Sequence, residues 1–455
     1  MIVILHGWSD SSKSFKNLGK FIHANELGPV ADIYLGDYVS MDDEVTYDDI
    51  KHAMQQAWVD KALPTSPRSV DVVVHSTGGL VIRDWMTTFF QPDTNPIHRL
   101  LFLAPANFGS PLAHKGNAVM GRIIKGFTAK KIFQTGRHIL HGLELASDYS
   151  WHLAERDLFG DHEWYGQGRV LGTVLVGNAG YNGISALANE DGSDGTVRVS
   201  TANLNAARMT WDFATDPGNP NHTLQSSRGA VAFCRLNDEN HSTIAKKGHG
   251  FHNKEQTGAL ILASLQVDDD GFDTHRNELE AISSSQRAEA RDLHDFDDRM
   301  FKGGYQNTVV RVSDDLGHDV TDYCIEFFAK NKKNNSKNNG NVDHLLTAKI
   351  QRKVIRSVHT YGVNPSYRSI LINTDMLKSL LVDKGRDLYL SLTALPQLEK
   401  NGVVGYKTLQ YHDIGSIHIA SADILSMAMA DRTLLIDIVI KRHHEGVFKF
   451  TPLAA

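Results

Sequence analysis

A serine that can act as a nucleophile lies where a buried strand is expected to turn into a helix. Four of the six residues of Val70–His75 are valine, and Ser76 follows directly. Thr77, Gly78 and Gly79 come next. A serine on such a turn lies at the end of a sheet, near helix N–H groups that favour developing negative charge. The segment therefore predicts a serine nucleophile for acyl transfer.

The sequence around this serine resembles the nucleophile turn of the α/β-hydrolase superfamily, and of its bacterial lipases and esterases in particular. The resemblance rests on His-Ser-Thr-Gly-Gly at 75–79. Val74 stands where the usual pattern has glycine, so the turn must accommodate a branched side chain. The resemblance implies that Ser76 is the catalytic nucleophile, and that an acid and then a histidine follow it in the chain.

A second segment, near the start of the chain, resembles the His-Gly-x turn of lipases. It runs Ile-Val-Ile-Leu-His-Gly-Trp at 2–8. The resemblance implies that the backbone N–H groups of Trp8 and Thr77 form the oxyanion hole, where each donor contributes about 3–4 kcal/mol to catalysis. His6 is expected to be structural, because it precedes the nucleophile and the family order ends in histidine.

The acid is expected in the loop after the predicted strand Val170–Val176. Ser-Asp-Gly-Thr-Val at 193–197 is similar to the Asp-Gly-x-Val loop of lipases, and the resemblance implies Asp194. Asp191 and Asp216 remain alternatives. The carboxylate is needed to orient the histidine and to stabilise its charged form.

The base is expected in the loop after the last strand of the sheet, predicted at Ala230–Leu236. His241 follows that strand in a short turn similar to the histidine loop of lipases. His249 and His252 are alternatives in the same region. The order of serine, acid and histidine favours His241.

The elements that must position these residues form an α/β pattern over residues 1–268. Short β-branched apolar runs alternate with helical patterns, which predicts a doubly wound, mostly parallel sheet. The predicted helices include Tyr47–Leu63 and Ala259–Leu265. The predicted strands are Ile2–Leu5, Ala31–Leu35, Val70–His75, Arg99–Leu103, Val170–Val176 and Ala230–Leu236.

The rest of the chain has a different pattern. Residues 269–304 are rich in charge and are expected to form a linker or a solvated helix. Residues 305–455 are expected to form a mainly β, sandwich-like domain. Its predicted extended runs are Thr308–Val312, Tyr323–Phe328, Ala348–Val358, Ser369–Asn373 and Leu388–Leu392.

An insertion of about residues 112–169 is longer than a simple crossover needs, and is expected to include a helical lid. Within it, Val119, Ile123 and Phe127 recur every four residues beside basic side chains. Two interpretations stay open: an amphipathic lid that meets a lipid surface, or an ordinary helix packed on the core. The aromatic residues after this helix are expected either to line an acyl pocket or to belong to the core. They are Trp151, Phe159, Trp164 and Tyr165.

Composition excludes several classes of protein. The chain of 455 residues has 47 Lys+Arg against 53 Asp+Glu, which argues against a general nucleic-acid binder. Its two cysteines cannot form a disulfide framework or a metal cluster. We expect no transmembrane segment and no secretory signal, because the apolar start is one short strand without a basic region before it. The expected location is the cytoplasm as synthesised, with leaderless export as an open alternative.

Together these features predict a serine carboxylic-ester hydrolase of lipase type that needs no cofactor and no metal. An acyl ester or lipid is the expected substrate. One alternative is a phospholipase A acting as a secreted antibacterial effector. An amidase or an acyltransferase would use the same three residues. A lipid-binding pseudoenzyme is the alternative from outside enzymes.

Overall fold

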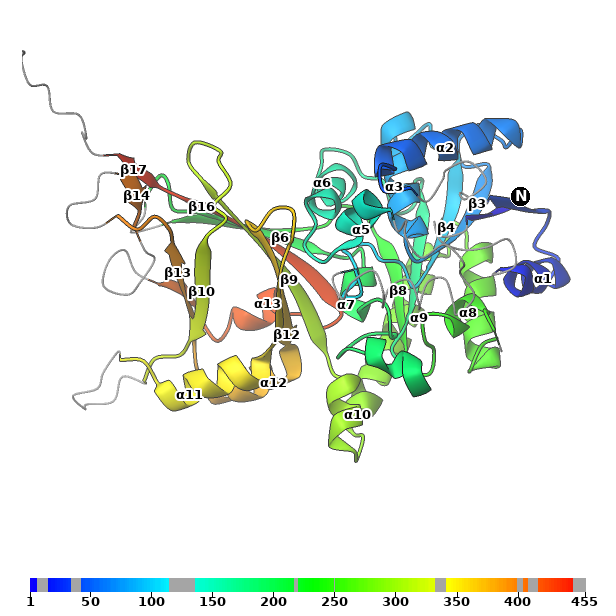
Figure 1. Ribbon diagram of the computed structural model, residues 1–455. Helices are drawn as coiled ribbons and strands as arrows, with labels where there is room; N and C mark the ends of the chain where they lie inside the picture. The colour runs from blue at the N-terminus through cyan, green and yellow to red at the C-terminus, as the bar shows by residue number, and fades with distance from the viewer. Residues whose placement is uncertain are drawn as a thin grey trace, which may run out of the picture. The chain divides into compact units, whose positions relative to one another are not determined.

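The computed structural model describes residues 1–5, 15–33, 42–113, 136–216, 220–248, 250–331, 341–398, 404–407 and 416–444. The chain divides into two compact units (Figure 1). The first unit comprises Met1–Ala206, Ser226–Asn307 and Asp431–Thr433. The second unit comprises Ala207–Gln225, Thr308–Ala430 and Leu434–Ala455.

A six-stranded parallel sheet forms the centre of the first unit, in the order β2-β1-β3-β4-β5-β8. Its inner strands are largely buried on both faces, which explains their nearly continuous apolar sequences. The predicted doubly wound parallel sheet is confirmed. The strands are β1 (Ile2–Leu5), β2 (Val30–Ile33), β3 (Val70–His75), β4 (Ile97–Leu103), β5 (Leu171–Gly177) and β8 (Val231–Leu236).

Helices cover both faces of this sheet (Figure 1). α1, α8 and α9 share one apolar cluster with the sheet, through residues such as Leu18, Ile261 and Leu279. α2 and α3 contact each other, and α3 also contacts α6. The helices of the first unit are α1 (Lys16–Ala24), α2 (Tyr47–Asp60), α3 (Gly78–Phe89), α5 (Arg137–Leu143), α6 (Asp148–Asp157), η2 (Gly183–Ala188), α7 (Val199–Ala202), η3 (Thr243–Ala245), α8 (Lys254–Gln266), α9 (Phe272–Arg291) and α10 (Phe296–Phe301).

The charged segment 269–304 is helical and belongs to the first unit. α9 packs against β8, and its buried positions recur at helical spacing, although only a few of them are large and apolar. Ser283 accepts a hydrogen bond from the Arg235 N–H at 3.1 Å, and Gln286 accepts one from the Asn237 N–H at 2.7 Å. Several of the buried residues of α9 are polar, so the composition of this segment resembles that of a linker although the helix is packed.

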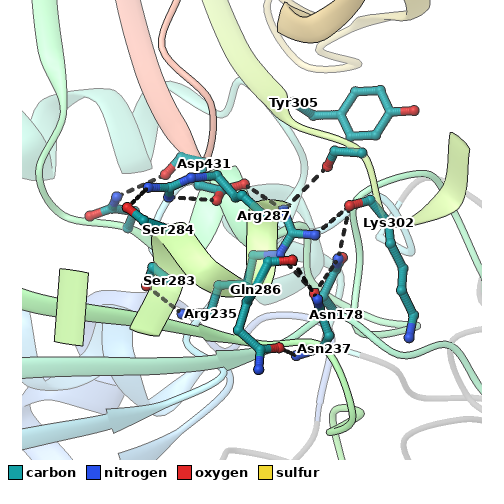
Figure 2. A network of polar contacts seen from close by, with 12 residues as sticks. Asn178, Arg235, Asn237, Ser283, Ser284, Gln286, Arg287, Lys302, Tyr305 and Asp431 are labelled. Carbon is teal, nitrogen blue, oxygen red and sulfur yellow. Dashed lines mark hydrogen bonds and ion pairs between the residues drawn. The ribbon is translucent and has the colours of Figure 1, made fainter. Parts of the chain in front are cut away.

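A buried ionic network joins β8, α9 and the segment Asp431–Thr433 (Figure 2). The Arg235 guanidinium is buried and donates to Asn237 Oδ1 at 3.0 Å, to the Lys302 carbonyl and to Asp431. Arg287 of α9 donates to the other oxygen of Asp431 at 3.1 Å. Asp431 thus balances two arginines in a region with little solvent, where a charge without a partner is costly.

The second unit is built from β-sheets that share one apolar core. A six-stranded sheet has the order β11-β12-β9-β16-β6-β7, and a three-stranded antiparallel sheet has the order β10-β13-β15. Side chains from both sheets form one buried cluster, as in a β-sandwich. The strands are β6 (Ala207–Asp212), β7 (Asn221–Ser226), β9 (Tyr305–Asp314), β10 (Tyr323–Phe328), β11 (Ile355–Thr360), β12 (Tyr367–Asn373), β13 (Leu388–Ala394), β14 (Val404–Tyr406), β15 (Ile417–Ile419), β16 (Arg432–Ile440) and β17 (Arg442–His444).

One predicted strand of this unit is wrong in its first half. The run Ala348–Val358 is extended only from Ile355 onward, where β11 begins. Before it lie α11 (His344–Lys349) and η4 (Ile350–Val354). The Asp343 side chain caps α11 by accepting the Leu346 N–H, and Leu346, Ile350 and Val354 form a buried stripe at helical spacing. The remaining helices are α12 (Thr374–Leu380), η5 (Val382–Lys384) and α13 (Ile424–Met427).

The division into units differs from the predicted boundaries at residues 268 and 304. Residues 207–225 lie within the range predicted as catalytic but belong to the second unit, and 269–307 belong to the first. β6 pairs in parallel with β16, so that Ala207 lies opposite Leu434 across a large sequence separation. None of the helices that the structure describes has the length and apolar character needed to cross a lipid bilayer.

The Asp431 network leads to a stability prediction. Asp431→Asn removes the charge but keeps a residue type that tolerates the positive φ of 59° at this position. The buried Arg235 loses its counter-charge, while the half-buried Arg287 keeps Glu280 at 2.6 Å, so we expect the free energy of unfolding to fall by about 3–5 kcal/mol. Urea unfolding followed by tryptophan fluorescence measures this change.

Asp273→Asn is the matched control for this variant. Asp273 pairs with Arg276 at 2.8 Å on an exposed face of α9, and loss of such a pair costs less than about 1 kcal/mol. Equal stability losses in the two variants would show that burial of the Asp431 network does not matter.

Candidate active site

Ser76 lies at the sharp turn between β3 and α3. Its φ of 55° is in the left-handed region, which costs a non-glycine residue about 1–3 kcal/mol. Three backbone hydrogen bonds hold it there: the Ser76 N–H donates to the Leu103 carbonyl at 3.2 Å, and the Ser76 carbonyl accepts from Ala106 at 3.2 Å and Gly79 at 3.1 Å. The turn leaves Ser76 half-buried at the carboxyl end of β3.

The two glycines after the serine have different roles. A Cβ atom at Gly79 would lie 2.9 Å from Pro105 Cβ and 3.0 Å from Asn107 Oδ1, so only glycine fits under this loop. A Cβ at Gly78 would meet Val74 Cβ at 3.5 Å, which is an ordinary contact. The turn therefore accommodates the branched Val74 that departs from the usual pattern.

His241 connects Ser76 to Asp194 by two hydrogen bonds. His241 Nε2 lies 3.0 Å from Ser76 Oγ, and His241 Nδ1 lies 2.9 Å from Asp194 Oδ2. A carboxylate only accepts, so Nδ1 carries the proton and Nε2 is free to accept the hydroxyl proton of the serine. The arrangement can transfer a proton from Ser76 to His241.

The Asp194 carboxylate is fully buried and is held by its own loop. Its Oδ1 atom accepts the N–H groups of Thr196 at 2.9 Å and Val197 at 2.7 Å, which leaves Oδ2 for His241. Burial and the negative charge of Asp194 raise the pKa of Tyr181 to about 12, so this neighbouring phenol stays neutral at physiological pH. Asp194 and His241 are also joined through their backbones, because the His241 N–H donates to the Asp194 carbonyl at 3.0 Å.

The loop that carries His241 is anchored to two helices. On the α9 side, the Asn237 side chain donates to the Gln286 carbonyl at 2.7 Å. On the α8 side, the buried Glu239 carboxylate accepts the Asn253 N–H at 3.0 Å and the Thr257 hydroxyl at 2.8 Å. These contacts fix the backbone on both sides of His241.

His75 supports the same loop from beneath, a role that the sequence did not reveal. Its Nε2 atom lies 2.9 Å from the His241 carbonyl oxygen, and its Nδ1 atom lies 3.3 Å from Lys247 Nζ. Nε2 must donate to the carbonyl, so Nδ1 accepts from the lysine and His75 is neutral. The His75 and His241 rings pack with their centroids 4.5 Å apart. His75 therefore positions the backbone of His241.

A buried ion pair fixes α3, the helix that follows Ser76. Arg83 of α3 donates to both oxygens of Asp157, at 2.7 Å and 2.9 Å, and to the Asn107 carbonyl at 3.0 Å. The Tyr165 hydroxyl donates to the same carboxylate at 3.0 Å. Both charged groups are fully buried. The pair joins α3 to α6 and to the loop that covers Gly79.

The structure brings together three of the five predicted site residues through direct hydrogen bonds, namely Ser76, Asp194 and His241. Thr77 follows Ser76 and immediately precedes α3, so its backbone lies at the turn, where the sequence predicts an oxyanion donor. Trp8 lies outside the described residues.

The alternatives for the acid and the base have other positions. Asp194, rather than Asp191 or Asp216, meets His241 Nδ1, and Asp216 belongs to the second unit. His252 is exposed, and its backbone N–H donates to Glu239 at 3.2 Å. His249 lies outside the described residues.

Much of the predicted lid helix, including Val119, Ile123 and Phe127, also lies outside the described residues. The aromatic residues that follow it in sequence are buried: Trp151, Phe159, Trp164 and Tyr165. Over the ranges that the structure describes, no group of three or more His, Cys, Asp or Glu side chains is arranged to hold a metal ion.

The structure resembles solved structures over the whole length of the chain. Phospholipase PlaB from Legionella pneumophila matches with a TM-score of 0.79 and 22% sequence identity, covering 100% of this chain and 97% of that chain. The same phospholipase in complex with thio-NAD matches with a TM-score of 0.80, the same identity and the same coverage. No protein-family model and no curated protein matches the sequence. The structural likeness confirms the predicted α/β-hydrolase fold and the additional β-sheets.

The contacts of His75 lead to a prediction about positioning. His75→Leu removes the donor to the His241 carbonyl, so we expect kcat to fall about 10- to 100-fold through loss of alignment. His75→Gln places an amide N–H near the original Nε2 position and is expected to restore most of the activity. Steady-state kinetics on a soluble nitrophenyl ester measure both variants.

A positioning role requires that KM change little, within about threefold, because His75 does not touch the substrate. Equal kcat values for the leucine variant and the unmodified protein would contradict the role. So would a glutamine variant as slow as the leucine variant while both remain folded by circular dichroism.

Proposed function

We propose that this chain is a serine carboxylic-ester hydrolase of lipase type. The observation that carries the proposal is the continuous hydrogen-bonded path from Ser76 Oγ through His241 to Asp194, at a strained strand-to-helix turn. A chain of nucleophile, base and orienting acid is the arrangement used for acyl transfer through a covalent intermediate. Fold alone would not support this choice, because one fold serves many activities.

In the proposed reaction, Ser76 Oγ attacks the carbonyl carbon of the ester while His241 Nε2 takes the hydroxyl proton. The tetrahedral oxyanion is stabilised by the backbone N–H of Thr77 and, as the sequence predicts, by that of Trp8. His241 then donates its proton to the leaving alcohol, which breaks the ester bond and leaves an acyl group on Ser76. His241 next takes a proton from a water molecule, which attacks the carbonyl carbon of the acyl group. His241 returns that proton to Ser76 Oγ as the acyl–oxygen bond breaks, which releases the acid and restores the serine.

Asp194 acts throughout by stabilising the charged form of His241. Its carboxylate is buried, so its attraction to the imidazolium is weakly screened by solvent. The N–H groups of Thr196 and Val197 donate to Oδ1 and fix the direction of the carboxylate. His241 therefore keeps one tautomer and one orientation during proton transfer.

A phospholipase A is the second candidate, favoured by the full-length likeness to a phospholipase. This candidate keeps the same nucleophile, acid and base and narrows the substrate to phospholipid. We also retain the proposal that the segment with Val119, Ile123 and Phe127 contacts a lipid surface. Synthesis in the cytoplasm with leaderless export, as for an antibacterial effector, stays a hypothesis about this candidate.

The first test uses a fluorophosphonate probe, which reacts with activated serines. We expect the unmodified protein to be labelled and Ser76→Ala to lose both the label and at least about 10³-fold of its esterase activity. Ser69→Ala, at the other end of β3, is the matched control and should keep both. An alanine variant at position 76 that retains activity would exclude Ser76 as the nucleophile.

The second test concerns the substrate. We expect the protein to release fatty acid from phospholipid vesicles and also to cleave short-chain nitrophenyl esters, with both activities absent in Ser76→Ala. Mass spectrometry of the products identifies the bond that is cut. If only soluble esters are turned over, the proposal of an ester hydrolase stands and the proposal of a phospholipase is rejected. Cleavage of amides, or acyl transfer to an alcohol without hydrolysis, would reject both.

A further inference from the structure

One stretch of the second unit is basic and contains no acidic residue. Residues 344–373 include no Asp or Glu, although the chain as a whole has a net charge of −6. This stretch covers α11, η4, β11 and β12. Its lysines and arginines are Lys349, Arg352, Lys353, Arg356 and Arg368. Four of these five side chains come from a short segment around η4.

The helical part of this stretch has one buried and one exposed side. Leu346, Ile350 and Val354 face the core of the second unit. The exposed positions recur at complementary spacing, so neighbouring turns present them together. We call these positions, together with the exposed Arg356 near the start of β11, the basic face: Leu345, Lys349, Arg352, Lys353 and Arg356.

The basic face also carries aliphatic side chains that solvent reaches. Leu345 is 80% exposed, and it precedes Lys349 and Lys353 by four and eight positions, on one line along the helix. Close by in sequence, on the edge strand β11, Val358 is 58% exposed. Leu345 thus places an exposed apolar side chain beside the cations of the basic face.

The acidic residue that directly precedes this stretch in sequence is engaged elsewhere. Asp343 caps α11 through the Leu346 N–H and pairs with Arg386 at 2.8 Å. Its pKa is lowered: burial opposes this shift, and the hydrogen bonds and the charges of Arg386 and Lys349 outweigh burial. Asp375 and Asp383 lie on the neighbouring α12 and η5. Glu326 lies on β10, which packs against α11 and η4, and its carboxylate accepts the Ser391 hydroxyl at 3.3 Å. Within the stretch 344–373 itself, no acidic residue stands among the four cations of the basic face.

We propose that the basic face is a docking surface for a membrane rich in anionic phospholipid. Lysine and arginine attract anionic head groups, and an exposed leucine among them can insert at the level of the acyl chains. A nucleic acid would use the cations but would give Leu345 and Val358 no apolar partner. The choice of lipid rests on the proposed function, because a lipid-ester hydrolase must reach substrate within a membrane surface.

Vesicle co-sedimentation with the full chain tests this proposal. The Ser76→Ala protein is used so that the lipid is not consumed, and the vesicles contain phosphatidylcholine with or without phosphatidylglycerol. We expect binding that needs phosphatidylglycerol and weakens as salt is raised. The triple variant Lys349→Gln/Arg352→Gln/Lys353→Gln is expected to bind at least about tenfold more weakly.

Two further variants separate charge from insertion and from folding. Lys16→Gln/Lys20→Gln/Lys61→Gln removes the same charge from exposed positions of the first unit and should bind like the parent protein. Leu345→Ser keeps the charge and should weaken binding severalfold, because it removes the inserting side chain. When each variant is made in the protein that retains Ser76, it should hydrolyse a soluble ester at the rate of the unmodified protein. This result would show that the fold is intact.

Three results would overturn the proposal. One is absence of binding to phosphatidylglycerol vesicles by the parent protein, and another is equal binding by the two triple variants. The third is loss of binding to a homopolymeric RNA in the first triple variant while vesicle binding is unchanged, which would assign the basic face to nucleic acid. Failure of the catalytic proposal would instead appear as esterase activity in Ser76→Ala and would leave the vesicle result interpretable.

Discussion

The backbone conformation of Ser76 is the constraint on which the rest of the site depends. A non-glycine residue at a φ of 55° returns to a relaxed conformation unless its surroundings prevent it. Here the preventing contacts come from β4 and the loop after it, through Leu103 and Ala106. That loop lies so close to α3 that only glycine fits at position 79. The position of Ser76 is therefore set by the path of the chain after β4.

The sequence could predict those parts of the site whose information is local. Ser76 lies in a short motif, and Asp194 and His241 each follow a continuous apolar strand that is easily recognised. Contacts that support them were not predictable, because each joins segments far apart in the chain through an ordinary side chain. Lys247 reaches His75 across 172 positions, and Gln286 reaches Asn237 across 49. Neither residue type carries a signal of its function.

The fold of the first unit could be predicted because its information is also local. The fold of the second unit could be predicted only in part. Parallel strands buried on both faces give continuous apolar runs, whereas the runs of the second unit are short and ambiguous. Ile350 and Val354 suit a strand by residue type and a helix by spacing, and the cap at Asp343 favours the helix. β6 alternates buried and half-buried residues and lies between Asp194 and His241 in sequence, yet it pairs with β16. Only the folded chain reveals that pairing.

Buried ion pairs lie on α3 and on β8, the two elements that precede or follow residues of the site directly in sequence. This placement has a physical consequence. Arg83 pairs with Asp157 behind Ser76, and Arg235 pairs with Asp431 behind the loop of His241. Such pairs add little net stability, because desolvation offsets most of their attraction. Their effect is selective: an arrangement of α3 or β8 that separates a pair leaves a charge buried without a partner. The packing of an apolar core tolerates small shifts more easily than this. We infer that the paired charges restrict α3 and β8 to one arrangement each, and thereby keep Ser76 Oγ and His241 Nε2 within hydrogen-bonding distance.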